Sequence, residues 1–150
     1  MSVQRKMATE IPLTTLEVEI PGDTRYVCLV RKSVKYLAAA LGFCGDDLDD
    51  IEVATAEAVT NAILHGTPAG SQGKIRIRCS DGQGSLIVEV EDEGNGRVAR
   101  ARRRICAEAE HGRGMFIIKT LMDDAETVTN RSGTHVRMTK RMKERAGSMT

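Results

Sequence analysis

Asp50-Ile-Glu-Val-Ala-Thr-Ala-Glu-Ala-Val-Thr-Asn-Ala-Ile-Leu-His-Gly66 is the stretch around which the chain is organised. It is mostly small or apolar, but Glu57, Asn61 and His65 recur at every fourth position. In a helix this spacing puts a carboxylate, an amide and an imidazole in a row on one side. The apolar remainder predicts a largely buried helix, in which polar side chains need partners or a function. Taken alone, the row also fits a solvated stripe.

Composition narrows the class of protein. The chain has 150 residues, with 41% hydrophobic and 29% charged, which suits one globular domain with a core. Tryptophan is absent and aromatic residues make up 3%, so stacking platforms for single-stranded nucleic acid are nearly excluded. The net charge of +1 gives no general attraction to DNA or to an anionic membrane. We therefore expect no direct nucleic-acid partner.

The cysteines predict a reducing compartment. Four are widely spaced, at positions 28, 44, 79 and 106, and no Cys-x-x-Cys pair occurs, so a zinc site is not expected. No segment resembles a signal peptide, and no apolar run approaches the roughly 20 residues that span a membrane. The sequence predicts a cytoplasmic protein with reduced thiols and no membrane partner.

Hydrophobic periodicity predicts the order β-α-α-β-β-loop-α-β-β. Strands are expected over 13–20, 74–80, 85–92, 125–130 and 134–139, and helices over 24–41, 50–66 and 115–122. Asp23 is the expected N-cap of the first helix, and an acidic run, 46–50, precedes the second. The short hairpin connections predict an α+β fold, a two-layer α/β sandwich whose mixed, mostly antiparallel sheet is covered on one face by helices.

The domain is expected over 13–140, between an N-terminal tail, 1–12, and a basic C-terminal tail, 141–150. Fraying is expected from Lys140 onward. Residues 94–114 show no clean period and hold many arginines and alanines.

A second candidate site follows the strand 85–92. Asp92 can accept a hydrogen bond from an amino group, and Gly94 and Gly96 let a backbone approach a ligand closely. A plain turn would explain these residues equally well. Residues 94–99 also fit the loose G-x-G-x-x-A dinucleotide fingerprint, but the preceding strand carries two glutamates and belongs to a hairpin, so we reject a Rossmann fold. No P-loop motif occurs.

Two weaker signals lie further along the chain. Gly112, Arg113 and Gly114 open a helix, where free backbone N–H groups and an arginine suit phosphate. Thr134 offers a hydroxyl at the start of a late strand, although it could be an ordinary strand residue.

Taken together, these motifs resemble the GHKL (Bergerat-fold) ATPase and kinase superfamily. The order is E-x-x-x-N on a helix, D-x-G-x-G after a strand, G-x-G before a helix and G-T in a late strand, covering about 13–140. Within that superfamily, the stretch from Glu57 to His65 and the pair Met122-Asp123 look like the anti-sigma-factor serine-protein kinases.

The resemblance implies a Bergerat sandwich that binds Mg-ATP. Asn61 would coordinate Mg²⁺ and Glu57 would act as catalytic base. Asp92 would bind the adenine amino group, and Gly94 and Gly96 would shape the adenine pocket.

The resemblance also assigns the later motifs. Gly112, Arg113 and Gly114 would hold the phosphates, with Arg113 assisting catalysis, and Thr134 would lie near the adenine. His65 receives no definite role. The sequence departs from the family in a lid segment, 97–104, that carries five arginines, and in a short G-x-G element. The lid reads either as a solvated loop or as an electropositive flap.

The function implied by the family is a serine/threonine kinase that is also an anti-sigma factor. It would phosphorylate a STAS-type anti-sigma-factor antagonist and sequester a sigma factor, in a partner-switching pathway that regulates transcription. Two alternatives stay open: a nucleotide-dependent binding regulator without kinase activity, and a detached histidine-kinase-like ATPase domain. The family resemblance also implies a homodimer, with its contact at the exposed edge of strand 13–20 or at the adjoining helix.

Overall fold

A computed structural model of the protein describes residues 13–66, 73–93, 112–130 and 133–143. The five strands are β1 (Leu13–Pro21), β2 (Lys74–Asp81), β3 (Ser85–Asp92), β4 (Asp124–Asn130) and β5 (Gly133–Arg141). The helices are the 3₁₀ turn η1 (Thr24–Tyr26), α2 (Val27–Leu41), α3 (Asp46–Gly66) and α5 (Gly112–Leu121). This order of elements confirms the one expected from periodicity.

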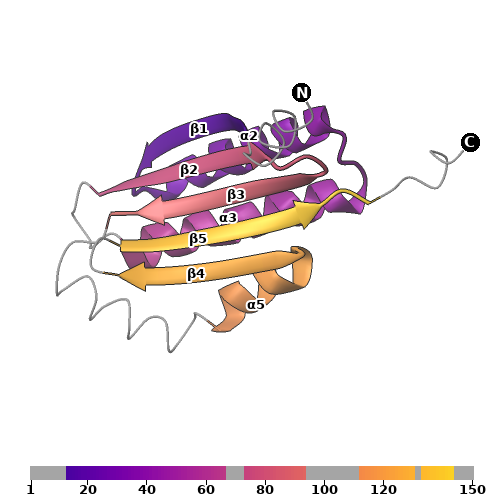
Figure 1. Cartoon of the computed structure of the whole chain (residues 1–150). Coiled ribbons are helices and arrows are strands. Elements are labelled where there is room, and N and C mark those ends of the chain that lie inside the picture. Colours follow the sequence, from indigo (N-terminus) through magenta and orange to yellow (C-terminus); the bar gives the residue numbers. More distant parts are fainter. Residues whose placement is uncertain (1–12, 67–72, 94–111, 131–132, 144–150) are drawn as a thin grey trace, which may run out of the picture.

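The strands form a single sheet in the order β1-β2-β3-β5-β4. The helices lie on one face of it, which makes the molecule a two-layer α+β sandwich as predicted (Figure 1). All four neighbouring pairs of described strands are antiparallel, so the parallel component expected of a mixed sheet is not found among them. β1 and β4 are the two edges. No described helix has the length and apolar character needed to cross a bilayer.

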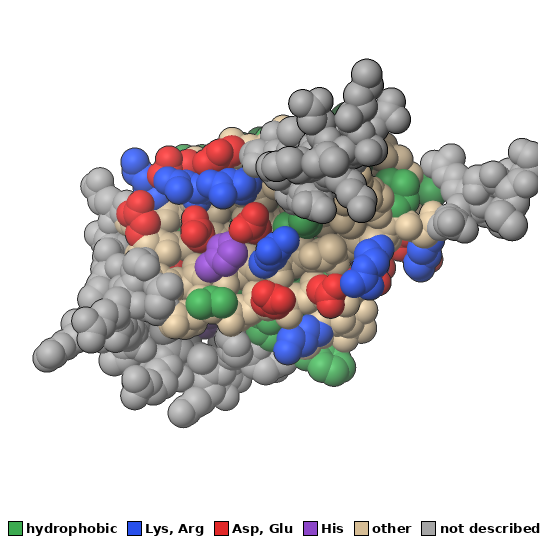
Figure 2. Space-filling model, in the orientation of Figure 1, with side chains coloured by type: hydrophobic (Ala, Val, Ile, Leu, Met, Phe, Trp, Pro, Cys, Tyr) green, Lys and Arg blue, Asp and Glu red, His purple; other side chains and the backbone are tan. Residues whose placement is uncertain are grey.

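The open face of the sheet is charged. One row crosses all five strands with alternating sign, because in register Glu17 lies opposite Arg78, Arg78 opposite Glu89, Glu89 opposite Arg137 and Arg137 opposite Glu126. Opposite charges on facing strands stabilise the pairing modestly. Figure 2 shows this face as a field of acidic and basic side chains with few apolar ones.

The core lies between the sheet and the helices. Period-two alternation turns Ile75, Ile77 and Cys79 of β2 inward, and none of the three exposes any surface. α3 faces them with the fully buried Ile51 and Val59. Each such aliphatic side chain contributes about 1.5–3 kcal/mol through burial. α3 is therefore anchored on the sheet along most of its length.

The first expected helix is divided in two. Asp23 caps η1 as predicted: its carboxylate accepts a hydrogen bond from the backbone N–H of Arg25 at 2.9 Å. A side-chain hydrogen bond from the Arg25 guanidinium is the main cause of the lowered pKa of Asp23. α2 ends at Gly42, whose φ of 112° is the left-handed conformation that favours glycine at a helix C-terminus.

Lys140 belongs to β5, beyond the strand end expected at residue 139. β5 continues to Arg141, and Lys140 is 6% exposed, on the inward side of the strand. Its Nζ lies 3.2 Å from Asp50 Oδ2 and 3.7 Å from Asp47 Oδ1, and it donates a hydrogen bond to the carbonyl oxygen of Leu121. The expectation of fraying from Lys140 onward is wrong at this residue. Its ammonium joins β5, the start of α3 and the end of α5.

Candidate functional site

α3 is the helix that gathers the candidate site. It packs against α2 on one side and α5 on the other, and it also contacts β2, β3 and β5. Glu57 and Asn61 are both half-buried, so they are neither core residues nor fully solvated. They are separated by one helical turn, about 6 Å along the axis. The helix row predicted from the spacing is therefore present at the surface of the helix layer.

The side chain of Asn61 lies against the first turn of α5. A Cβ built on Gly114 would lie 3.3 Å from both Cγ and Oδ1 of Asn61, and closer still to Nδ2. Gly114 is buried, so the contact has little room to open. Only glycine allows α5 to begin this close to Asn61. The structure thus joins two motifs that are more than 50 positions apart in the sequence.

Asp92 forms the second cluster, at the end of β3. It is 6% exposed, and its Oδ1 accepts a hydrogen bond from the backbone N–H of Thr134 at 3.2 Å. Gly66, the last residue of α3, lies on the other side, where a Cβ would come within 2.5 Å of Asp92 Oδ2. The carboxylate is therefore held between the end of α3 and the start of β5.

The two clusters lie along the same stretch of α3. Asn61 and Gly66 are five residues apart, which corresponds to about 7.5 Å along a helix. One end offers a buried carboxylate, an acceptor suited to an amino group. The other offers an amide oxygen beside a helix N-terminus, whose first four N–H groups have no partner within the helix and suit phosphate. Together the two clusters offer groups that are chemically suited to the base and to the phosphates of a nucleotide.

The remaining predicted residues are placed less completely. Gly112 and Arg113 form the start of α5, but the side chain of Arg113 is outside the described residues, as are Gly94, Gly96 and the lid segment 97–104. The Oγ1 atoms of Thr134 and Thr129 lie 3.4 Å apart.

His65 stands half-buried in the last turn of α3. The sequence predicts no definite role for it, and its position in the helix adds none.

Gly66 lies in the candidate site but belongs to none of the predicted motifs. The sequence shows it only as a glycine at the end of a helix, which ordinarily indicates a cap. Its close approach to Asp92 depends on how β3 packs beneath α3, and helical periodicity carries no information about that distance. The useful signal was its position directly after His65, at the end of the helix row.

The donor set suits magnesium held mainly by phosphates. Among the described residues, no group of three or more His, Cys, Asp or Glu side chains could hold a metal ion. Mg²⁺ in nucleotide sites commonly keeps several waters and takes few protein ligands, with the substrate phosphates supplying others. Asn61, next to the start of α5, fits that sparse kind of coordination.

The three cysteines that the structure describes lie outside this site. Burial raises the pKa of Cys79 to about 12, which keeps this thiol protonated and unreactive. Cys28 and Cys44 are free and exposed, on α2 and in the loop after it.

Comparison with known proteins first defines the class. The family model of the histidine kinase-like ATPase domain matches residues 20–140, which includes α3, Asp92 and the start of α5. The solved structure of the RsbU and RsbW domains of a Mycobacterium tuberculosis protein has the same fold, with a TM-score of 0.63 and 24% sequence identity. That match covers 91% of this chain and 35% of the other.

The curated relatives are more specific. The chain is 30% identical over 135 residues to proteins named serine-protein kinase RsbW from Bacillus velezensis and from Bacillus subtilis. Each match covers 83% of this chain and 84% of the relative. The chain belongs to the histidine kinase-like (GHKL) ATPase domain family, among the relatives of the RsbW serine-protein kinases.

Proposed function

We propose that the protein is a Mg-ATP-dependent serine/threonine kinase that also acts as an anti-sigma factor. It phosphorylates a STAS-type anti-sigma-factor antagonist and sequesters a sigma factor, and the two partners compete for it. The RsbW relatives support the kinase assignment, since they are named serine-protein kinases and match most of the chain. The proposal includes a cytoplasmic location and a homodimer through the free edge of β1.

One observation carries the proposal. α3 places Asn61 against the start of α5 and Gly66 against Asp92, so a single rigid helix spans a phosphate end and a base end. Glu57 lies one turn from Asn61 on the same helix, on the side away from the base end. This order, carboxylate, amide and then buried carboxylate, would put the proposed base beyond the phosphate end of a bound ATP, where an acceptor hydroxyl would approach.

The chemistry follows from these positions. Asp92 accepts a hydrogen bond from the adenine amino group, and the N–H groups at the start of α5 hold phosphate oxygens. Bound Mg²⁺ would neutralise phosphate charge, with Asn61 as its protein ligand. Glu57 takes the proton from the acceptor hydroxyl, and the hydroxyl oxygen forms a bond to the γ-phosphorus. At the same time the bond between the γ-phosphorus and the bridging β-phosphate oxygen breaks, which releases ADP. Positioning and charge neutralisation supply most of the acceleration in such reactions.

Glu57→Gln tests the proposal. With Mg-ATP and a purified STAS-type antagonist, the wild-type protein should transfer phosphate to a serine or threonine, and Glu57→Gln should be about 10²–10⁴-fold slower with unchanged ATP affinity. Asp49→Asn is the matched control, because Asp49 is an exposed carboxylate on the same helix. It should transfer at the wild-type rate.

Two outcomes would count against a kinase. ATP binding with no transfer to any antagonist would indicate the regulator without kinase activity. Equal rates for wild type and Glu57→Gln would remove Glu57 as the base.

A further inference from the structure

We infer that the outer stripe of α3, formed by Val53, Thr60 and Leu64 beside Glu57, is the docking surface for the protein that carries the acceptor hydroxyl. The inference rests on the proposed kinase function and adds to it the surface that binds the protein substrate. The partner that fits is a folded protein with an apolar patch around an exposed serine or threonine.

Exposed apolar side chains are concentrated on the helix layer. Among the described residues, the exposed large hydrophobic ones are Leu29 and Tyr36 on α2, Val53 and Leu64 on α3, Phe116 on α5, and Val128 on β4. Five of these six lie on helices, whereas the open sheet face carries paired charges and is well suited to water (Figure 2). Single exposed apolar side chains are ordinary on a protein surface. What distinguishes a docking surface is therefore which of them lie beside the proposed base.

Helical geometry aligns the stripe with the proposed base. Positions 53, 57, 60 and 64 follow the spacing that keeps residues on one side of a helix. Val53 is 45% exposed and Leu64 is 53% exposed. Relative to Glu57, Val53 lies about 6 Å back along the axis and Leu64 about 10 Å forward. The carboxylate is therefore bracketed by two apolar side chains.

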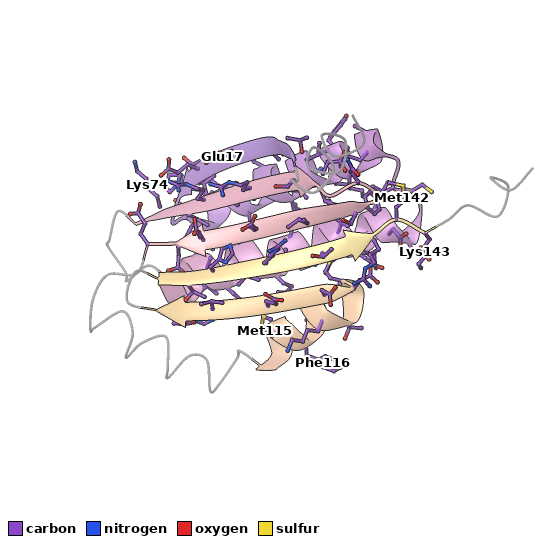
Figure 3. All side chains as sticks on the ribbon, in the orientation of Figure 1. Glu17, Lys74, Met115, Phe116, Met142 and Lys143 are labelled. Atoms are coloured by element: carbon purple, nitrogen blue, oxygen red, sulfur yellow. The ribbon has the colours of Figure 1, made fainter. Side chains whose placement is uncertain are left out.

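This bracketing identifies the occupant. An acceptor hydroxyl must come within about 3 Å of its base. A folded protein that delivers one to Glu57 therefore docks around it, where Val53 and Leu64 are the exposed apolar side chains of the same helix. The other exposed apolar side chains of the helix layer do not flank Glu57. Leu29 and Tyr36 belong to α2. Phe116 projects away from the molecule at α5, while its neighbour Met115 faces β4 (Figure 3).

The charges beside the stripe favour an apolar partner rather than a basic one. Asp49 and Glu52 are already paired with Lys35 of α2, whose Nζ lies 3.2 Å and 3.0 Å from their carboxylates. The hydrogen bonds that Lys35 donates to Glu52 and then to Asp49 raise its pKa. Arg31 Nε also lies 3.9 Å from Glu52 Oε2, so the two carboxylates are balanced by two cations of α2. Glu57 is left as the acidic group of the stripe that can engage the acceptor.

The test separates docking from chemistry. Val53→Gln and Leu64→Gln remove the apolar groups and introduce glutamine, a residue with good helix propensity. The probe is a purified STAS-type antagonist that the wild-type protein phosphorylates. The double variant should raise the KM for this antagonist at least tenfold, with unchanged kcat and unchanged ATP affinity. The matched control is Val128→Gln, which removes a valine that is 52% exposed on β4 and should change nothing.

Each other result has a definite meaning. An unchanged KM in the double variant overturns the docking surface and leaves the kinase standing. A fall in oligomeric mass by light scattering with unchanged KM identifies a contact between copies of this chain and also overturns it. If the Gln variants lose helical circular dichroism, Val53→Ala and Leu64→Ala take their place with the same expected KM. If the wild type phosphorylates no antagonist, the proposed function fails, and the docking inference falls with it.

Discussion

Asn61 of α3 lies so close to Gly114 of α5 that residue 114 has no room for a side chain. The same contact therefore fixes both the Asn61 amide, the proposed metal ligand, and the start of α5. A substitution at residue 114 should change the free energy of unfolding in opposite directions, depending on whether Asn61 is present.

Gly114→Ala should destabilise the wild type and stabilise an Asn61→Ala protein. In the wild type, the added Cβ overlaps the Asn61 amide, and such overpacking costs about 1–3 kcal/mol. Without that amide the clash disappears, and replacing glycine by alanine in a helix gains about 0.5–1 kcal/mol. Urea unfolding of the four proteins in the cycle measures both free-energy changes. Equal effects in the two backgrounds would show that Asn61 does not occupy this position.

Asp92→Asn should weaken ATP binding about 10- to 100-fold. The variant keeps the shape of the side chain but removes the charge, and a hydrogen bond to a charged group is worth about 1.5–3 kcal/mol. Isothermal titration calorimetry measures the Kd. Glu91→Gln is the control, since Glu91 is the exposed neighbour on the same strand. An unchanged Kd in Asp92→Asn would exclude Asp92 from the base-binding end.

Lys140→Met should lower the free energy of unfolding by about 1–3 kcal/mol, because it leaves the Leu121 carbonyl and two aspartates without their buried cation. Lys143→Met is the matched control: the side chain of Lys143 is 80% exposed and lies 3.7 Å from Asp47. Such a surface change is usually within 0.5 kcal/mol. Equal urea midpoints for both variants would contradict a stabilising role for the buried Lys140 ammonium.

Strand and helix periodicity predicted most of this fold, since alternation sets which side chains of β2 and β3 face inward and spacing sets the buried side of α3. The same reasoning failed at Lys140. Lys140 continues the inward alternation of Val136 and Met138, but a lysine near a basic tail suggests an exposed strand end. Its partners come from α3 and α5, so only the packed structure shows why the charge can be buried.

The candidate site was predictable in its residue types and not in its contacts. Spacing alone aligned Glu57 with Asn61, because both belong to one helix. The meetings of Asn61 with Gly114, and of Asp92 with Gly66, join segments far apart in sequence and depend on how three elements pack. No local pattern encodes those distances.

The buried Cys79 thiol should make stability fall at alkaline pH. Burial raises its pKa from an ordinary 9.0 to about 12, so the fold favours the protonated thiol. The stabilisation is therefore complete below pH 9.0 and is lost as the pH rises toward 12. Between pH 8 and 10.5, wild type should lose about 2 kcal/mol more than Cys79→Val, which cannot ionise. Parallel losses in urea unfolding would show that the thiol ionises equally in both states.

Magnesium dependence of ATP binding tests most directly whether α3 organises a Mg-ATP site. ATP is titrated by calorimetry into wild type and Asn61→Ala, each with Mg²⁺ and with EDTA. Mg²⁺ should tighten binding to wild type about tenfold or more, which corresponds to about 1.4 kcal/mol, and should have little effect on Asn61→Ala. Wild-type affinity that is the same with Mg²⁺ and with EDTA would contradict the role of Asn61 and the site built around it.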